Sequence, residues 1–158
     1  MAKKRVTLPK EFKDLMDEGN IEALKAVYDR CELTAHDGRF SLCTPLHMGG
    51  VPDELVIWLV EKGLDINVPD YYGATPLYRQ AILGRDTVKL LLELGADIEK
   101  PNTYGDTPLH MAAEFFHPKT VKLLIDKGAD VNAKNDMGRT PLASVLMVCR
   151  GIYIAQTA

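Results

Sequence analysis

Thr107-Pro108-Leu109-His110 is one of four related tetrapeptides in this sequence. The others are Thr44-Pro45-Leu46-His47, Thr75-Pro76-Leu77-Tyr78 and Thr140-Pro141-Leu142-Ala143, and successive copies are 31, 32 and 33 residues apart. A threonine hydroxyl can cap the start of a helix, and proline suits the first helical position because its missing N–H is not needed there. Each tetrapeptide therefore predicts the start of a helix, and the near-constant spacing predicts a repeated structural unit.

Two further markers keep the same phase as the tetrapeptides. One begins with a glycine, and its copies are Gly63-Leu64-Asp65-Ile66-Asn67, Gly95-Ala96-Asp97-Ile98-Glu99 and Gly128-Ala129-Asp130-Val131-Asn132. The other ends with a glycine, and its copies are Asp70-Tyr71-Tyr72-Gly73, Asn102-Thr103-Tyr104-Gly105 and Asn135-Asp136-Met137-Gly138. The first glycine is expected to stop a helix in the left-handed conformation, and the Asp/Asn-x-x-Gly group is expected to form a tight turn.

Apolar residues recur at matching positions before each helix-stopping glycine. The sets are Val56, Trp58 and Leu59; Val88, Leu90 and Leu91; and Val121, Leu123 and Leu124. This spacing turns one face of a second helix inward. The leucine of each tetrapeptide, Leu142 included, is expected to begin the buried stripe of the first helix. Trp58 aligns with Leu90 and Leu123 and is expected in the core.

Three markers in one phase, at a period of about 33 residues, resemble the ankyrin repeat family over about residues 8 to 150. The resemblance implies an all-α, ankyrin-type helical solenoid of stacked helix-turn-helix repeats with short turns or β-hairpin fingers. The expected organisation is a basic N-terminal tail, residues 1–7, followed by a single domain, residues 8–158. That domain divides into an N-terminal capping repeat (8–41), three repeats (42–72, 73–104 and 105–137) and an incomplete C-terminal repeat (138–158).

The sequence departs from the family pattern in each of the three central repeats. Gly49-Gly50 stands where the family has Ala-Ala, so the first helix of that repeat is expected to be weak. The next repeat carries Tyr78 in place of histidine and Gln80 in place of alanine. The following one carries Phe115-Phe116 where the family has a polar residue and glycine.

Composition excludes several classes of protein. The chain of 158 residues has a formal net charge of −3, which gives no indication of nucleic-acid binding. No apolar stretch has the length of a membrane span, and none follows the basic start as in a secretory signal. Cys31, Cys43 and Cys149 show no CxxC spacing, so a reduced, cytoplasmic protein is predicted.

The sequence contains no recognisable catalytic or metal-binding motif. Phosphate-binding glycine loops, His-Glu-x-x-His, paired CxxC and EF-hand spacings do not occur. We therefore expect no enzyme activity, no cofactor and no metal. The family resemblance implies that His47 and His110 tie neighbouring turns together, whereas His36 and His117 are expected to lie solvated in turns.

The resemblance implies that the fingertips and the exposed side of the first helices line a concave groove that binds a partner protein. Transferred by position, the expected contact residues are Tyr71, Tyr72, Ala74, Arg79, Leu83, Thr103, Tyr104, Asp106, Glu114, Phe115, Asp136, Met137 and Arg139. Phe40 and Met111 could also contribute or could pack between fingers. Two alternatives stay open at this point: a regulatory or positioning segment of a larger enzyme or channel, and a dedicated inhibitor of one enzyme.

The C-terminal end lacks a polar capping face. No counterpart of the Val-Lys-Leu-Leu helix is evident there, and no charged residue follows Arg150. Either the chain continues in a longer protein or a partner or second copy covers this end. We expect the last helix to pack on residues 111–113 and 121–125 and to leave its far side apolar and exposed. Weak self-association through this end, or fraying of it, is the corresponding prediction.

Overall fold

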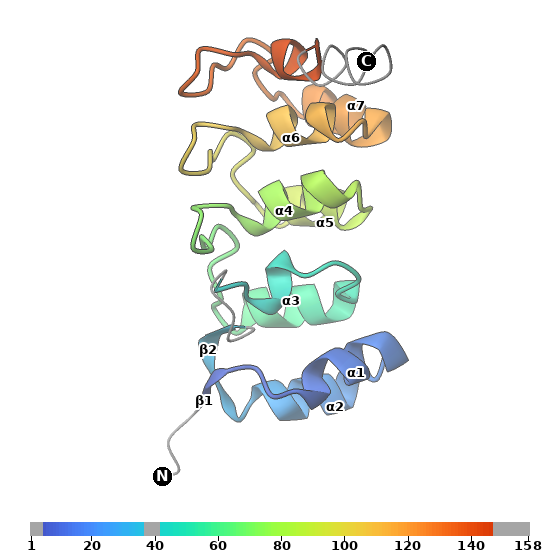
Figure 1. Cartoon of the computed structure of the whole chain (residues 1–158). Coiled ribbons are helices and arrows are strands. Elements are labelled where there is room, and N and C mark those ends of the chain that lie inside the picture. The colour runs from blue at the N-terminus through green and yellow to red at the C-terminus, as the bar shows by residue number, and fades with distance from the viewer. Residues whose placement is uncertain (1–4, 37–41, 147–158) are drawn as a thin grey trace, which may run out of the picture.

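Helix pairs are stacked in layers along one axis, and loops project from one side of the stack (Figure 1). The computed structural model describes residues 5–36 and 42–146. Its elements are β1 (Arg5–Thr7), α1 (Glu11–Glu18), α2 (Ile21–Tyr28), β2 (Cys31–His36), the 3-10 helix η1 (Pro45–His47), α3 (Asp53–Glu61), α4 (Pro76–Leu83), α5 (Thr87–Glu93), α6 (Pro108–Glu114) and α7 (Pro118–Asp126). Residues 141–146 are also helical. The predicted all-α helical solenoid is confirmed.

The tetrapeptides start the first helices as predicted. Thr75 Oγ1 accepts a hydrogen bond from Tyr78 N at 3.2 Å, and Pro76 is the first residue of α4. Thr107 Oγ1 accepts from His110 N at 3.4 Å in the same way, at the start of α6. The second helices stop at left-handed glycines, since φ is 93° at Gly63, 92° at Gly95 and 96° at Gly128.

The core is a continuous column of leucine and valine side chains between the layers. The tetrapeptide leucines Leu46, Leu77 and Leu109 are at most 2% exposed, whereas Leu142 is 67% exposed. The prediction of a buried Leu142 is therefore wrong within the described residues. The rest of the same repeat, residues 147–158, lies outside the described residues.

The first helix of the second repeat is as weak as Gly49-Gly50 predicts. It consists only of the single turn η1, and Gly50 adopts a left-handed φ of 81°. Helical N–H donors for the carbonyls of Leu46 and Met48 are missing, because Gly50 leaves the helix and Pro52 has no N–H. Gln80 from α4 takes their place, since its Nε2 donates to Leu46 O at 3.2 Å and to Met48 O at 2.8 Å.

The N-terminal segment differs from the predicted tail. Arg5–Thr7 form strand β1, which pairs in parallel with β2, and Arg5 lies opposite Cys31. The pairing extends to Leu8, whose N–H donates to His36 O at 2.7 Å. Backbone pairing between segments far apart in the sequence thus holds residues 5–7, although their composition is that of a solvated tail.

Trp58 lies at the flank of α3 and is only half-buried, so the prediction of a core position is wrong in degree. Leu55, Val56 and Leu59 occupy the inward face of the helix, which leaves the indole at its edge. The predicted contact between repeats is present, because the indole meets Tyr28 of α2 edge-on with ring centroids 6.1 Å apart.

Replacing Gln80 with methionine keeps its volume but removes both hydrogen bonds to the second repeat. We expect Gln80→Met to lower the free energy of unfolding by about 1–3 kcal/mol, the usual cost of leaving buried polar groups unpaired. Lys119→Met, on the exposed side of α7, is the control and should change it by less than about 0.5 kcal/mol. Urea denaturation measures both, and equal stabilities would show that Gln80 does not compensate for the shortened helix.

Candidate functional site

The turns at residues 70–73, 102–105 and 135–138 form three consecutive fingers. Three side chains occupy the same place on these fingers. They are Tyr72, Tyr104 and Met137, each directly before the turn glycine, and we call them the finger row. The fingers are joined through their backbones, because Thr103 N donates to Tyr72 O at 3.0 Å and Asp136 N donates to Tyr104 O at 3.1 Å. The row is therefore a feature of a connected strip rather than of three separate loops.

One side-chain oxygen shapes each finger turn. Asn102 Oδ1 accepts from Tyr104 N at 2.9 Å and from Asp106 N at 3.0 Å. Asn135 Oδ1 accepts from Met137 N at 3.1 Å and from Arg139 N at 3.0 Å. These bonds fix the backbone on both sides of the turn glycine, so the finger-row residues are held by their own N–H groups.

The turn glycines allow neighbouring fingers to approach closely. Gly73 and Gly105 have left-handed φ values of 72° and 75°. A Cβ at Gly73 would lie 3.1 Å from Thr103 N, and a Cβ at Gly105 would lie 2.7 Å from Asp136 Oδ1. Conformation and space both require glycine at these two positions.

Each finger is also tied to the first helix of the preceding repeat. His47 Nδ1 accepts from Thr44 N at 3.1 Å, so its proton is on Nε2, which lies 3.0 Å from Val68 O and 3.1 Å from Ala74 O. His110 Nε2 reaches Arg139 O at 2.9 Å in the same way. The structural role that the resemblance implied for both histidines is the one that the geometry shows.

Tyr78 stands at the position that is histidine in the neighbouring repeats. It also connects the first helix to the next finger, but through its hydroxyl group instead of an imidazole nitrogen. Its hydroxyl accepts a hydrogen bond from Asn102 Nδ2 at 2.8 Å, so it also reaches the next finger. Burial raises the pKa of the Tyr78 phenol, with a smaller contribution from the nearby Asp106 carboxylate, which keeps the hydroxyl neutral.

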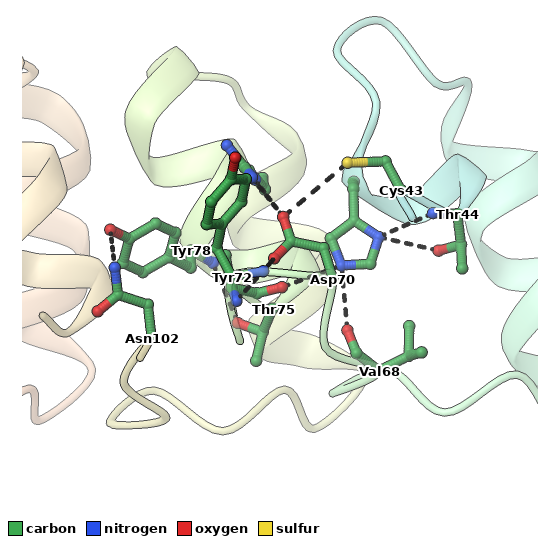
Figure 2. A network of polar contacts seen from close by, with 11 residues as sticks. Cys43, Thr44, Val68, Asp70, Tyr72, Thr75, Tyr78 and Asn102 are labelled. Atoms are coloured by element: carbon green, nitrogen blue, oxygen red, sulfur yellow. Dashed lines mark hydrogen bonds and ion pairs between the residues drawn. The ribbon is translucent and has the colours of Figure 1, made fainter. Parts of the chain in front are cut away.

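A buried carboxylate organises the first of these fingers (Figure 2). Asp70 Oδ1 accepts from Tyr72 N at 2.8 Å and from Ala74 N at 3.0 Å, as the asparagines do in the later fingers. Its Oδ2 accepts from Arg79 Nε at 2.7 Å and also from Nη2 of the same guanidinium. The Cys43 thiol lies 3.9 Å from the same oxygen. The ion pair supplies the partner that a buried carboxylate requires.

The ion pair with Asp70 holds the Arg79 guanidinium next to the Tyr72 ring. The Tyr72 ring centroid lies 5.9 Å from Arg79 Cζ, which is within the range of a cation–π contact. Tyr71 meets Tyr72 edge-on at 5.3 Å between ring centroids. Two adjacent aromatic rings and a fixed guanidinium therefore share one fingertip.

Most of the predicted contact residues are accessible. The side chains of Tyr71, Tyr72, Tyr104 and Met137 are 65%, 44%, 55% and 66% exposed, and Leu83 and Phe115 are 43% and 49% exposed. Thr103 and Asp136 are also exposed, and Arg79, Asp106, Glu114 and Arg139 are half-buried.

Ala74 is the exception, and the prediction that its side chain contacts a partner is wrong. It is 1% exposed and packs with Tyr78 of α4 and Met111 of α6, so its side chain offers no contact surface. Met111 is 6% exposed and buried in the same cluster, so its side chain is not part of the accessible surface. Phe40 lies outside the described residues.

His117 is not solvated as predicted. Its Nε2 lies 2.8 Å from Ile82 O, so it joins the loop after α6 to the end of α4. Gly84 leaves room for the ring, because a Cβ at this position would lie 2.4 Å from His117 Nδ1. Among residues 5–36 and 42–146, no group of three or more His, Cys, Asp or Glu side chains could hold a metal ion. No described helix is long and apolar enough to cross a membrane.

Two family models match the chain. The model described as "Ankyrin repeats (3 copies)" matches residues 15–102, which is more than half of the sequence. The model described as "Ankyrin repeat" matches residues 104–136. No curated protein matches the chain.

The buried, hydrogen-bonded ring of His47 should make the free energy of unfolding depend on pH. Burial lowers the pKa of His47 from its ordinary value of 6.5, although the Asp70 carboxylate acts in the opposite direction. The unfolded chain therefore binds this proton more readily than the folded chain, and the free energy of unfolding should fall as the pH drops below about 6.5. His47→Gln should lose less stability than the parent between pH 7.5 and pH 5.

Urea unfolding at both pH values, with NMR titration of the His47 ring in the parent, makes the measurement. A ring pKa at or above 6.5 would contradict the buried neutral imidazole.

Proposed function

This chain belongs to the ankyrin repeat family, and on that premise we propose that it binds a partner protein along the finger row and the adjoining first helices. Ankyrin repeats are generally protein–protein interaction modules and are typically non-catalytic. The observation that carries the proposal is the finger row itself, because Tyr72, Tyr104 and Met137 are exposed at one position of three backbone-linked fingers.

The chemistry of the row suits an interface. Tyrosine and methionine are enriched at protein interfaces, and aromatic anchors often dominate the binding energy. The backbone beneath them is already fixed by the turn oxygens and by the links between fingers, so binding orders few additional groups. A preorganised surface of this kind loses little conformational entropy when it meets a partner.

The first helices extend the surface beyond the fingers. Leu83 and Phe115 occupy equivalent positions at the ends of α4 and α6, and both are exposed. Arg79 supplies a guanidinium that Asp70 holds in place, which adds a directional polar contact to an otherwise apolar set. The proposed partner therefore presents apolar side chains along a line, with an acceptor group facing Arg79.

Three sequence predictions stay predictions. A regulatory role in a larger enzyme or channel and inhibition of a single enzyme would both use this same surface, so the identity of the partner distinguishes them. The cytoplasmic location likewise rests on the sequence.

The finger row is tested by substituting its two tyrosines together. Tyr72→Ala with Tyr104→Ala should weaken partner binding by at least about 2 kcal/mol, or roughly 30-fold, if these rings are hot-spot anchors. The thermal unfolding temperature should change little, because both side chains are exposed. The partner is first captured from extracts of the native host with the full chain, and its affinity is then measured by calorimetry.

Ile57→Ala serves as the matched control, because Ile57 is an exposed apolar residue of α3 and lies outside the finger row. It should leave the affinity unchanged. A captured partner that binds the double variant as tightly as the parent would refute the proposed surface.

A further inference from the structure

A pocket lies between α1 and the residues that follow η1, in the first two layers of the stack (Figure 1). It has a volume of about 490 Å³, within the range of about 300–1,000 Å³ that is usual for ligand pockets. We call it the N-terminal pocket. Phe12, Met16 and Met48 give it apolar walls, and Lys10 and Lys13 are the charged residues that line it.

The pocket lies beside the shortened first helix of the second repeat. η1 ends after one turn, and Met48 directly after it is already extended, with a ψ of 142°. Gly49 and Gly50 follow and carry no side chain. Their equivalents Gln80 and Ala81 are helical in α4 and fully buried. The space next to α1 is therefore a departure of this chain from its own repeat pattern.

The core holds two walls of the pocket in place. Phe12 and Met16 are 1% and 9% exposed, so the packing of α1 fixes their side chains. Phe12 also contacts Tyr28 of α2, with ring centroids 6.1 Å apart. An apolar group that enters the pocket therefore meets a preformed surface, which reduces the entropic cost of binding.

Three cations gather at the pocket. Lys10 and Lys13 are exposed at the start of α1. The guanidinium of Arg85 lies near Gly49, because a Cβ at that glycine would be 3.9 Å from Arg85 Nη2. None of the three cations forms an ion pair with a carboxylate within residues 5–36 and 42–146. The whole chain has a net charge of −3, so this excess of positive charge belongs to the site and not to the composition.

The pocket adjoins the surface proposed for partner binding. Gly49 lines the pocket, and a Cβ at this position would lie 3.0 Å from Leu83 Cδ1. Leu83 is 43% exposed and belongs to the first-helix part of the proposed surface. A protein bound along that surface can therefore extend past Leu83 into the pocket.

The apolar groove formed by α6, α7 and residues 141–146, at the other end of the described stack, has a different charge pattern. Its volume is about 780 Å³, and its Lys122 and Asp126 are ion-paired to each other at 2.6 Å. The charges of this groove therefore specify no occupant, and weak self-association through this end stays a prediction.

We propose that the N-terminal pocket binds an apolar side chain of the partner protein that is flanked by aspartate or glutamate residues. The proposal rests on the function proposed above and names the chemistry of one segment of the partner. Lys10 and Lys13 are three residues apart on a helical backbone, so they lie side by side on one face. Their ammonium groups can meet carboxylates on both sides of the inserted side chain, which steers and orients the segment. The acidic residues of the same region, Glu11, Asp14 and Asp17, do not line the pocket.

Peptide selection on the full chain tests this chemistry. We expect phage-displayed random heptapeptides to be enriched in sequences with a large apolar residue next to aspartate or glutamate. Lys10→Glu with Lys13→Glu should weaken binding of the enriched peptide by at least about tenfold and should shift the selection toward lysine and arginine. Lys119→Glu with Lys127→Glu is the matched control, because both lysines are exposed near the ends of α7 and the change in charge is the same. Absence of acidic enrichment in the parent, or its loss in the control as well, would overturn the proposal.

Methionine methyl NMR then locates the bound peptide. The Met16 and Met48 methyls should shift when the enriched peptide is added, whereas the Met137 methyl of the finger row should not. A shift of Met137 without Met16 or Met48 would place the peptide on the finger row and overturn this proposal, while leaving the proposed function intact. Tyr72→Ala with Tyr104→Ala should bind the peptide as the parent does, so failure of the finger row and failure of the pocket are read separately. Loss of peptide binding in that double variant would also overturn the pocket as its site.

Discussion

The hydrogen bond from the first helix of one repeat to the finger of the next is the contact on which the rest of the structure depends. His47, Tyr78 and His110 make it with different atoms, but each crosses the same boundary. Helix packing alone would stack the repeats and leave the fingers loose. With the tie in place, each finger takes its position from the helix beneath it, and the exposed side chains acquire a fixed spacing.

Repeat architecture also explains why departures from the pattern come with compensation. In the second repeat the glycine pair shortens the first helix, and Gln80 from the next repeat donates to the exposed carbonyls. Gln80 Oε1 has no partner among the described residues, so the amide is present for its donor. In the first finger, Asp70 takes the place of an asparagine and pairs with Arg79. Each change is local to one boundary, as expected where a repeat contacts only its neighbours.

The features that follow from the repeat period could be predicted from the sequence. The features that depend on the surroundings of individual side chains could not. The helix starts, the glycine stops and the finger turns follow from residue types at fixed spacing. The pairing of β1 with β2 was not predictable, because it joins segments outside the repeat pattern. Ala74 and Trp58 occupy the expected elements, but their burial depends on neighbours in adjacent repeats. The finger row was identified by position, whereas the backbone links that rigidify it could be seen only in three dimensions.

The most direct test of the tie between repeats is amide exchange in Tyr78→Phe. This change removes only the hydroxyl that accepts from Asn102 Nδ2. If the tie positions the finger, the amides of Tyr104 and Asp106 should exchange roughly fivefold to tenfold faster, as the loss of about 1 kcal/mol implies. The amides of Tyr72 and Ala74, in the preceding finger, should be unaffected. Unchanged protection of Tyr104 and Asp106 would contradict the claim that the first helix of one repeat holds the finger of the next.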